Sequence, residues 1–198
     1  MTSIEHQALP VEVALSLYHL LVFLHVLGAI GIFVALAIES VSLGRLRNAA
    51  TLVEARAWVD VHKLSGRLGA IAMIGTIGAG IGLVAQGWGR QPWILGAIVG
   101  LVGMMVVGAS LSARRARRLR VTLADAAGPD LPDGFRSIRS PTPLTAPLRL
   151  RIALGIGIVG LMTVKPGAVG AALILIAAAL SGLVAGIPFA ASRLRARA

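Results

Sequence analysis

Residues 14–43 are ALSLYHLLVFLHVLGAIGIFVALAIESVSL, an apolar run in which Glu39 is the only Asp, Glu, Lys or Arg. About 20 consecutive apolar residues are enough for a helix to cross the hydrocarbon core of a bilayer. Four more apolar runs follow, at residues 66–86, 93–112, 148–164 and 167–190. The sequence therefore predicts an all-α, polytopic transmembrane bundle of five spans that forms a single domain over residues 1–198.

The composition supports lipid as the surrounding solvent. The chain has 198 residues, of which 57% are hydrophobic and 14% are charged, and its mean hydropathy is +0.86. A soluble domain carries about 25% charged residues, which it needs to cover its surface. So few charges could cover a soluble domain of this size only thinly, which excludes an ordinary soluble fold.

The fourth predicted span is the shortest, and Arg149 and Arg151 at its start are expected to snorkel to the interface. The tripeptide Lys165-Pro166-Gly167 predicts a helix break between the fourth and fifth spans. The alternative for residues 148–190 is one kinked helix with a re-entrant segment.

Basic residues are distributed very unevenly between the two sides of a five-span bundle. One side receives all 19 Lys and Arg residues except Arg90 and Lys165. Because basic loops stay in the cytoplasm, the N-terminus is predicted outside and the C-terminus inside. Arg far outnumbers Lys, which is typical of a GC-rich bacterial genome, so the expected location is a bacterial inner membrane.

The longest predicted loop, about residues 113–147, begins with a basic continuation of the third helix. Its arginines are expected to contact anionic lipid headgroups, and the alternative is that they only determine topology. Nucleic acid is not expected as a partner, because no aromatic residues are interleaved with these charges. The arginines are Arg114, Arg115, Arg117, Arg118 and Arg120.

His25 is the main candidate for a binding residue. At 100° per residue it shares a face of the first span with Tyr18, Gly28 and Glu39, and the small residues on this face are expected to turn inward and leave room for a large group. A neutral imidazole near mid-membrane could ligate the metal of haem or another tetrapyrrole, or relay protons. The alternative is a hydrogen bond to a carbonyl or hydroxyl of a neighbouring helix.

Three other ionisable residues are weaker candidates. His19 lies on a bulkier face and is expected to pack at the interface. Glu39 is near a span end, where a snorkelling carboxylate is favoured over a proton site. His62 is expected at a depth about 15 Å or more from His25, which disfavours a bis-histidine haem site. The chain has no cysteine, so it has no thiolate ligand.

The motif LHVLGAI at residues 24–30, followed by Gly31 and a basic exit at Arg45 and Arg47, resembles a family of small bacterial predicted integral membrane proteins of unknown function. More remotely, it is similar to the superfamily of the copper-resistance D proteins and the membrane protoporphyrinogen oxidase. The resemblance covers about residues 15–120 and implies that His25 is a haem or porphyrin ligand. Spans two to five lack the further His and Lys of the oxidase, which argues against oxidase activity.

We therefore expect a non-enzymatic membrane component, either an accessory subunit or a tetrapyrrole-binding bundle, because no catalytic set is recognisable. The alternative is a small transporter or channel for ions or a small solute. The expected partners are the bilayer, anionic lipids, and other membrane subunits or a second copy of the chain. Pairs of glycines four residues apart, such as Gly96 with Gly100, are expected to pack helices within one chain rather than between chains.

Overall fold

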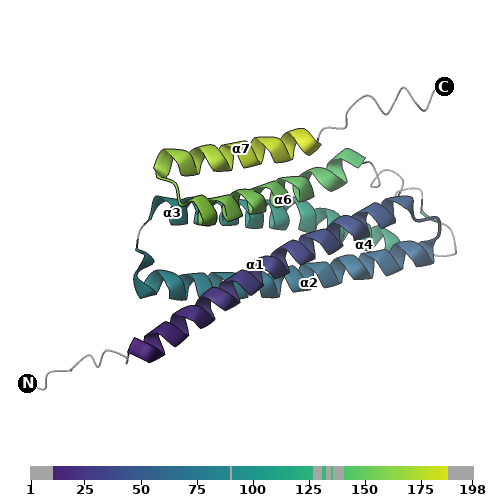
Figure 1. The fold of residues 1–198 in the computed structure, drawn as a ribbon. Coiled ribbons are helices and arrows are strands. Elements are labelled where there is room, and N and C mark those ends of the chain that lie inside the picture. The colour runs from purple at the N-terminus through teal and green to yellow at the C-terminus, as the bar shows by residue number, and fades with distance from the viewer. Residues whose placement is uncertain (1–10, 90, 127–130, 133–134, 136–140, 187–198) are drawn as a thin grey trace, which may run out of the picture.

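The structure is a computed structural model, and it describes residues 11–89, 91–126, 131–132, 135 and 141–186 (Figure 1). In these ranges the chain forms long helices and no strand. The α-helices are α1 (Val11–Asn48), α2 (Leu52–Leu83), α3 (Pro92–Val107), α4 (Ala113–Ala124), α6 (Pro141–Val164) and α7 (Ala168–Gly186). Two short π-helical segments, η1 (Val84–Trp88) and η2 (Gly108–Ser112), follow α2 and α3.

Five of these helices are long and apolar enough to cross a membrane, as the sequence predicted. The candidate spans are Ser16–Asn48, Leu52–Gly87, Pro92–Leu111, Ala146–Val164 and Ala168–Ala185. A break at residues 165–167 separates α6 from α7, so these are two helices and not one kinked helix. Residues 187–190 of the fifth predicted span, and the Arg193–Arg197 tail, lie outside the described residues.

The helices extend further than the predicted spans. The 38 residues of α1 correspond to about 57 Å, nearly twice the hydrocarbon thickness of about 30 Å. Residues 44–67, expected to connect the first two spans, are largely helical, and only residues 49–51 separate α1 from α2. The Thr51 hydroxyl accepts from the Glu54 amide at 3.2 Å, and the Glu54 carboxylate accepts from the Ala50 amide at 3.0 Å. These reciprocal bonds cap α2 and explain why the connection is so short.

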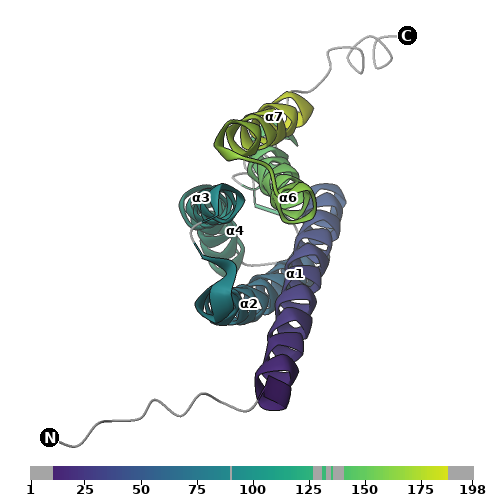
Figure 2. The same ribbon diagram turned by 60° about the vertical axis from the view of Figure 1, so that its left-hand side comes forward.

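α1 and α2 form one antiparallel pair, while α3 and α7 flank α6 in a second group (Figures 1 and 2). Small residues let the helices of the second group approach closely. A Cβ added to Gly100 would meet Ile158 and Leu175 at 3.0 Å, and one added to Gly182 would meet the Leu150 backbone at 2.8 Å. These glycines therefore pack helices within the chain, as expected, whereas Gly78 faces open space.

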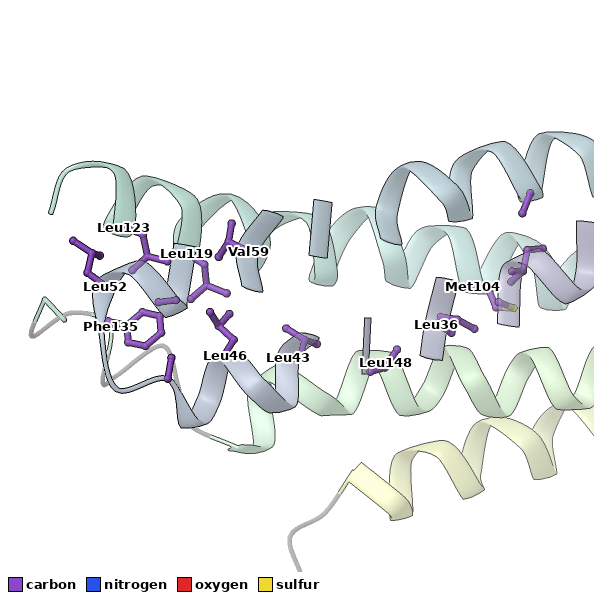
Figure 3. Packing of buried hydrophobic residues seen from close by; sticks show 14 of the residues in the cluster. Leu36, Leu43, Leu46, Leu52, Val59, Met104, Leu119, Leu123, Phe135 and Leu148 are labelled. Atoms are coloured by element: carbon purple, nitrogen blue, oxygen red, sulfur yellow. The ribbon is translucent and has the colours of Figure 1, made fainter. Parts of the chain in front are cut away.

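The two groups are joined mainly at the end of the bundle that carries α4, here called the α4 end. A cluster of buried side chains fills this end (Figure 3). We call it the inner cluster, and its larger members are Leu36, Leu43, Leu46, Leu52, Val59, Met104, Leu119, Leu123, Phe135 and Leu148. The opposite end, here called the η1 end, contains η1, the first half of α1 and the break between α6 and α7.

Candidate functional site

His25 contacts the second helix directly. Its Nδ1 lies 2.9 Å from the Thr76 carbonyl oxygen of α2. A carbonyl oxygen only accepts hydrogen bonds, so Nδ1 carries a proton, and in the neutral ring Nε2 then keeps its lone pair. The ring is only partly buried. Histidines that bind metals through Nε2 are commonly held in this way by a backbone carbonyl, so the contact fits both the ligand and the structural interpretation.

Gly28 corrects one expectation, because its small size does not leave room for a large group. A Cβ at Gly28 would clash with the Thr76 Oγ1 and approach the Thr76 nitrogen to 2.9 Å. One turn further on, a Cβ at Gly31 would lie 2.9 Å from the Ala72 Cβ. The space is filled by α2 itself, since glycines in membrane helices let two backbones approach closely.

Tyr18 and His19 lie one to two turns further toward the N-terminus. Their rings meet edge to face, with centroids 5.7 Å apart and planes at 76°. Tyr18 is half-buried, as expected for the inward face, and His19 is exposed, as expected for the bulkier one. They belong to the η1 end and do not extend the contact of His25 with Thr76.

Glu39 differs from the expectation of a snorkelling carboxylate. Its side chain is 9% exposed, and Oε2 accepts from Arg151 Nη1 of α6 at 2.7 Å. Arg151 was also expected to snorkel, but it turns into the bundle and is 19% exposed, whereas Arg149 is exposed. Side chains two positions apart on a helix point in directions that differ by about 200°. Only one of these two arginines can therefore face α1. A buried carboxylate needs a charged partner, and Arg151 provides it.

Polar groups from α1 and α2 surround this ion pair. The Ser42 hydroxyl donates to the Glu39 carbonyl oxygen at 2.9 Å and lies 3.4 Å from His62 Nδ1. Among the described residues, Arg151 Nε is a buried nitrogen without a hydrogen-bond partner. Together Glu39, Ser42, His62 and Arg151 form what we call the polar junction. The sequence does not reveal this junction, because its members come from three helices and Arg151 lies 112 residues from Glu39.

His62 and His25 belong to different levels of the bundle, as expected. His25 contacts Thr76, and His62 precedes Thr76 on α2 by 14 residues, which is a rise of about 21 Å. Across the described ranges, no three His, Asp or Glu side chains lie close enough to hold a metal ion.

α4 continues α3 through η2, as the sequence predicted, and it is strongly amphipathic. Leu119 and Leu123 are buried in the inner cluster, whereas the described arginine side chains are exposed. These are Arg114, Arg117, Arg118 and Arg120; the side chain of Arg115 is not described. Arg56 of α2 donates to the Leu123 carbonyl oxygen at 2.9 and 3.2 Å. This contact holds the C-terminal end of α4 against α2.

Comparisons with protein-family models, with curated proteins and with solved structures found no match to this chain. The resemblance carried by residues 24–30 thus remains an expectation. The two candidate sites are the His25 contact with α2 and the polar junction.

Proposed function

We propose that this chain is a non-enzymatic component of a bacterial inner membrane and that His25 binds the metal of a tetrapyrrole such as haem. The observation that carries the proposal is the 2.9 Å contact between His25 Nδ1 and the Thr76 carbonyl oxygen. It leaves Nε2 as the ligating atom and fixes the plane of the ring. A bound haem would supply electron-transfer or gas-binding chemistry.

The packing of α1 limits where such a group could bind. α2 packs directly against Gly28 and Gly31, so a tetrapyrrole must approach His25 from the side of the ring that faces away from α2. No residue from Ser16 to Gly31 is buried, so this part of α1 is accessible from the bilayer. Among the described residues, His25 is the one that would hold the group, through Nε2, and any further ligand would come from a small molecule or another subunit.

The visible spectrum of the gently purified protein tests this proposal. A Soret band is expected after expression with haem precursors, and His25→Ala should remove most of the pigment while His19→Ala keeps it. His25→Asn is the sharper variant, because its amide can still donate to the Thr76 carbonyl but has no Nε2. Pigment loss in His25→Asn with stability retained supports ligation. A protein without absorbance beyond 300 nm, even after reconstitution with haem, contradicts it.

A second candidate function, transport of an ion or small solute, is favoured by the polar junction. Ionisable groups inside a membrane protein are costly and mark ion or proton pathways, and here Glu39 and Arg151 bridge α1 and α6 at 2.7 Å. Proton flux into vesicles containing the protein and a pH-sensitive dye tests this function. Flux above that of protein-free vesicles, abolished by Glu39→Gln and kept in the exposed control Asp60→Asn, would support transport. Absence of flux would leave the junction with a structural role.

The proposed orientation follows from the charge asymmetry, with the α4 end in the cytoplasm. The exposed arginines of α4 would then lie beside anionic headgroups, each contributing about 1 kcal/mol to membrane attraction. Because the chain has no cysteine, single cysteines can be placed at the exposed positions Ala124 and Val169. In intact cells, an impermeant reagent should label Val169→Cys and not Ala124→Cys; the reverse pattern would contradict the orientation.

A further inference from the structure

An apolar groove of about 510 Å³ lies between α3 and α7 at the η1 end. Its volume falls within the range of about 300–1,000 Å³ typical of ligand pockets. None of the residues that line it has a polar side chain: they are Pro92, Leu95, Gly96 and Val99 of α3, and Ala168, Ala171, Ala172, Leu175 and Ile176 of α7. The groove therefore accepts a hydrocarbon and not a polar solute.

Small residues create this groove. α3 and α7 both pack on α6, and they approach each other where a Cβ on Gly96 would lie 3.2 Å from the Ala171 Cβ. On α7, the neighbouring wall positions Ala168 and Ala172 carry only methyl groups. Leu161 of α6, which is fully buried, packs beneath this contact. The side chains of the protein thus leave the groove open to the bilayer.

The length of the groove identifies its occupant. Its lining runs from Pro92 to Val99 on α3 and from Ala168 to Ile176 on α7, which corresponds to about 10–12 Å along each helix. Half of the hydrocarbon core is about 15 Å thick. The acyl chain of one leaflet fits this length.

A positively charged residue, Lys165, lies three residues before Ala168, the first α7 residue that lines the groove. The Lys165 ammonium is 5.8 Å from the centroid of the Trp93 ring, and Trp93 is adjacent to the lining residue Pro92. Lys165 has a φ of 51°, a left-handed conformation that glycine adopts with about 1–2 kcal/mol less strain. A lysine thus occupies a position where the backbone favours glycine, and its charge is held at the membrane boundary.

We propose that the groove binds an anionic phospholipid, with one acyl chain between α3 and α7 and the phosphate beside Lys165. The length of the apolar groove matches one acyl chain of such a lipid. The ammonium of Lys165 matches its negatively charged phosphate. The site is separate from His25 and from the polar junction, and it does not depend on the proposed function.

Fluorescence quenching of Trp93 tests the site in the full-length protein. The protein, with Trp58→Phe and Trp88→Phe, is reconstituted in phosphatidylcholine vesicles that contain a small fraction of brominated phosphatidylglycerol or brominated phosphatidylcholine. We expect the anionic lipid to bind about fivefold more strongly at Trp93, which corresponds to about 1 kcal/mol at 25 °C. Equal quenching of Trp93 by the two brominated lipids would by itself overturn the proposal.

Three variants separate lipid binding from folding. Lys165→Gly should fold at least as stably, because glycine relieves the backbone strain at this position, yet it should lose the preference for phosphatidylglycerol. Ala172→Phe should fill the groove and reduce quenching by both lipids severalfold. Ala177→Phe, which changes an exposed α7 residue outside the groove, should have no effect. Quenching that is unchanged in Ala172→Phe, or a preference that survives Lys165→Gly, would overturn the proposal.

Discussion

The two halves of α1 are packed in different ways although both are apolar. From Ser16 to Gly31 no residue is buried, and the helix packs chiefly on α2. From Ile32 onward, buried residues recur at the three- and four-residue spacing of one helix face. α2 and α6 pack against this half, and Leu119 and Leu123 of α4 belong to the same buried cluster. The first half therefore depends on one close helix contact, while the second half belongs to a true core. Four pairs of variants can test this difference.

The largest effect is expected at the polar junction. Arg151→Leu leaves the Glu39 carboxylate buried without its partner, which costs about 4 kcal/mol in the free energy of unfolding. Unfolding by a denaturing detergent, followed by circular dichroism, measures it. The matched control is Lys63→Ala, which removes the exposed pair with Asp60 and should cost less than about 1 kcal/mol. Equal effects of the two variants would show that the junction is solvated.

A smaller loss of unfolding free energy is expected when a large side chain of the inner cluster is shortened. Leu36→Ala should cost about 3 kcal/mol, because Leu36 is 2% exposed and the surrounding helices cannot collapse completely into the cavity. Leu27→Ala, in the first half of the same helix, changes a side chain that is 52% exposed and should cost less than about 0.5 kcal/mol. If Leu27→Ala destabilises as strongly as Leu36→Ala, the two halves of α1 are not packed differently.

The contact between the first half of α1 and α2 can be broken by a single methyl group. Gly28→Ala introduces a Cβ into the Thr76 backbone and should cost about 2 kcal/mol through overpacking. Gly78→Ala is the control, because nothing lies within 4 Å of its added Cβ; it should be neutral or stabilising by about 0.5 kcal/mol. A destabilisation of equal size in both variants would mean that the Gly28 contact is not specific.

The smallest effect concerns the hydrogen bond of His25. His25→Ala should reduce the unfolding free energy by about 1 kcal/mol, which is typical of a polar contact between membrane helices. The same denaturation assay measures it, and His25→Asn should restore part of the loss by donating to the Thr76 carbonyl. Full stability in His25→Ala would show that the bond contributes nothing and that His25 is kept for another purpose.

The number of candidate membrane spans and the break at residues 165–167 could be predicted from the sequence, because each depends on local hydrophobicity or on a proline. The true length of α1 and α2 could not be seen in averaged hydropathy. Arg45 lowers the average at the end of α1, although Leu43 and Leu46 continue its buried face. Arg56 does the same at the start of α2, where Leu52, Ala55 and Val59 are buried at helical spacing. Those positions follow the period of a helix, so a search for periodicity would have found the extension.

The candidate sites were predictable only in part. The inward face that includes His25 and Glu39 followed from helical geometry, but their partners depend on which helices are neighbours. Thr76 lies 51 residues from His25, and Arg151 lies 112 residues from Glu39. Nothing local to Gly28 distinguishes a glycine that makes space for a ligand from one that brings two helices together. That distinction belongs to the tertiary structure.

The π-helical segment η2 sets the rotational phase of α4 relative to α3. A π-helical turn accommodates one residue more than an α-helical turn, and one residue corresponds to about 100° of rotation. If η2 were shortened by one residue to a regular α-helix, α4 would turn by that angle about its own axis. Leu119 and Leu123 would then leave the inner cluster, and Arg120 and Ala124 would take their places. The five residues from Gly108 to Ser112 thus determine which side of α4 is apolar toward the protein and which side presents its positive charges.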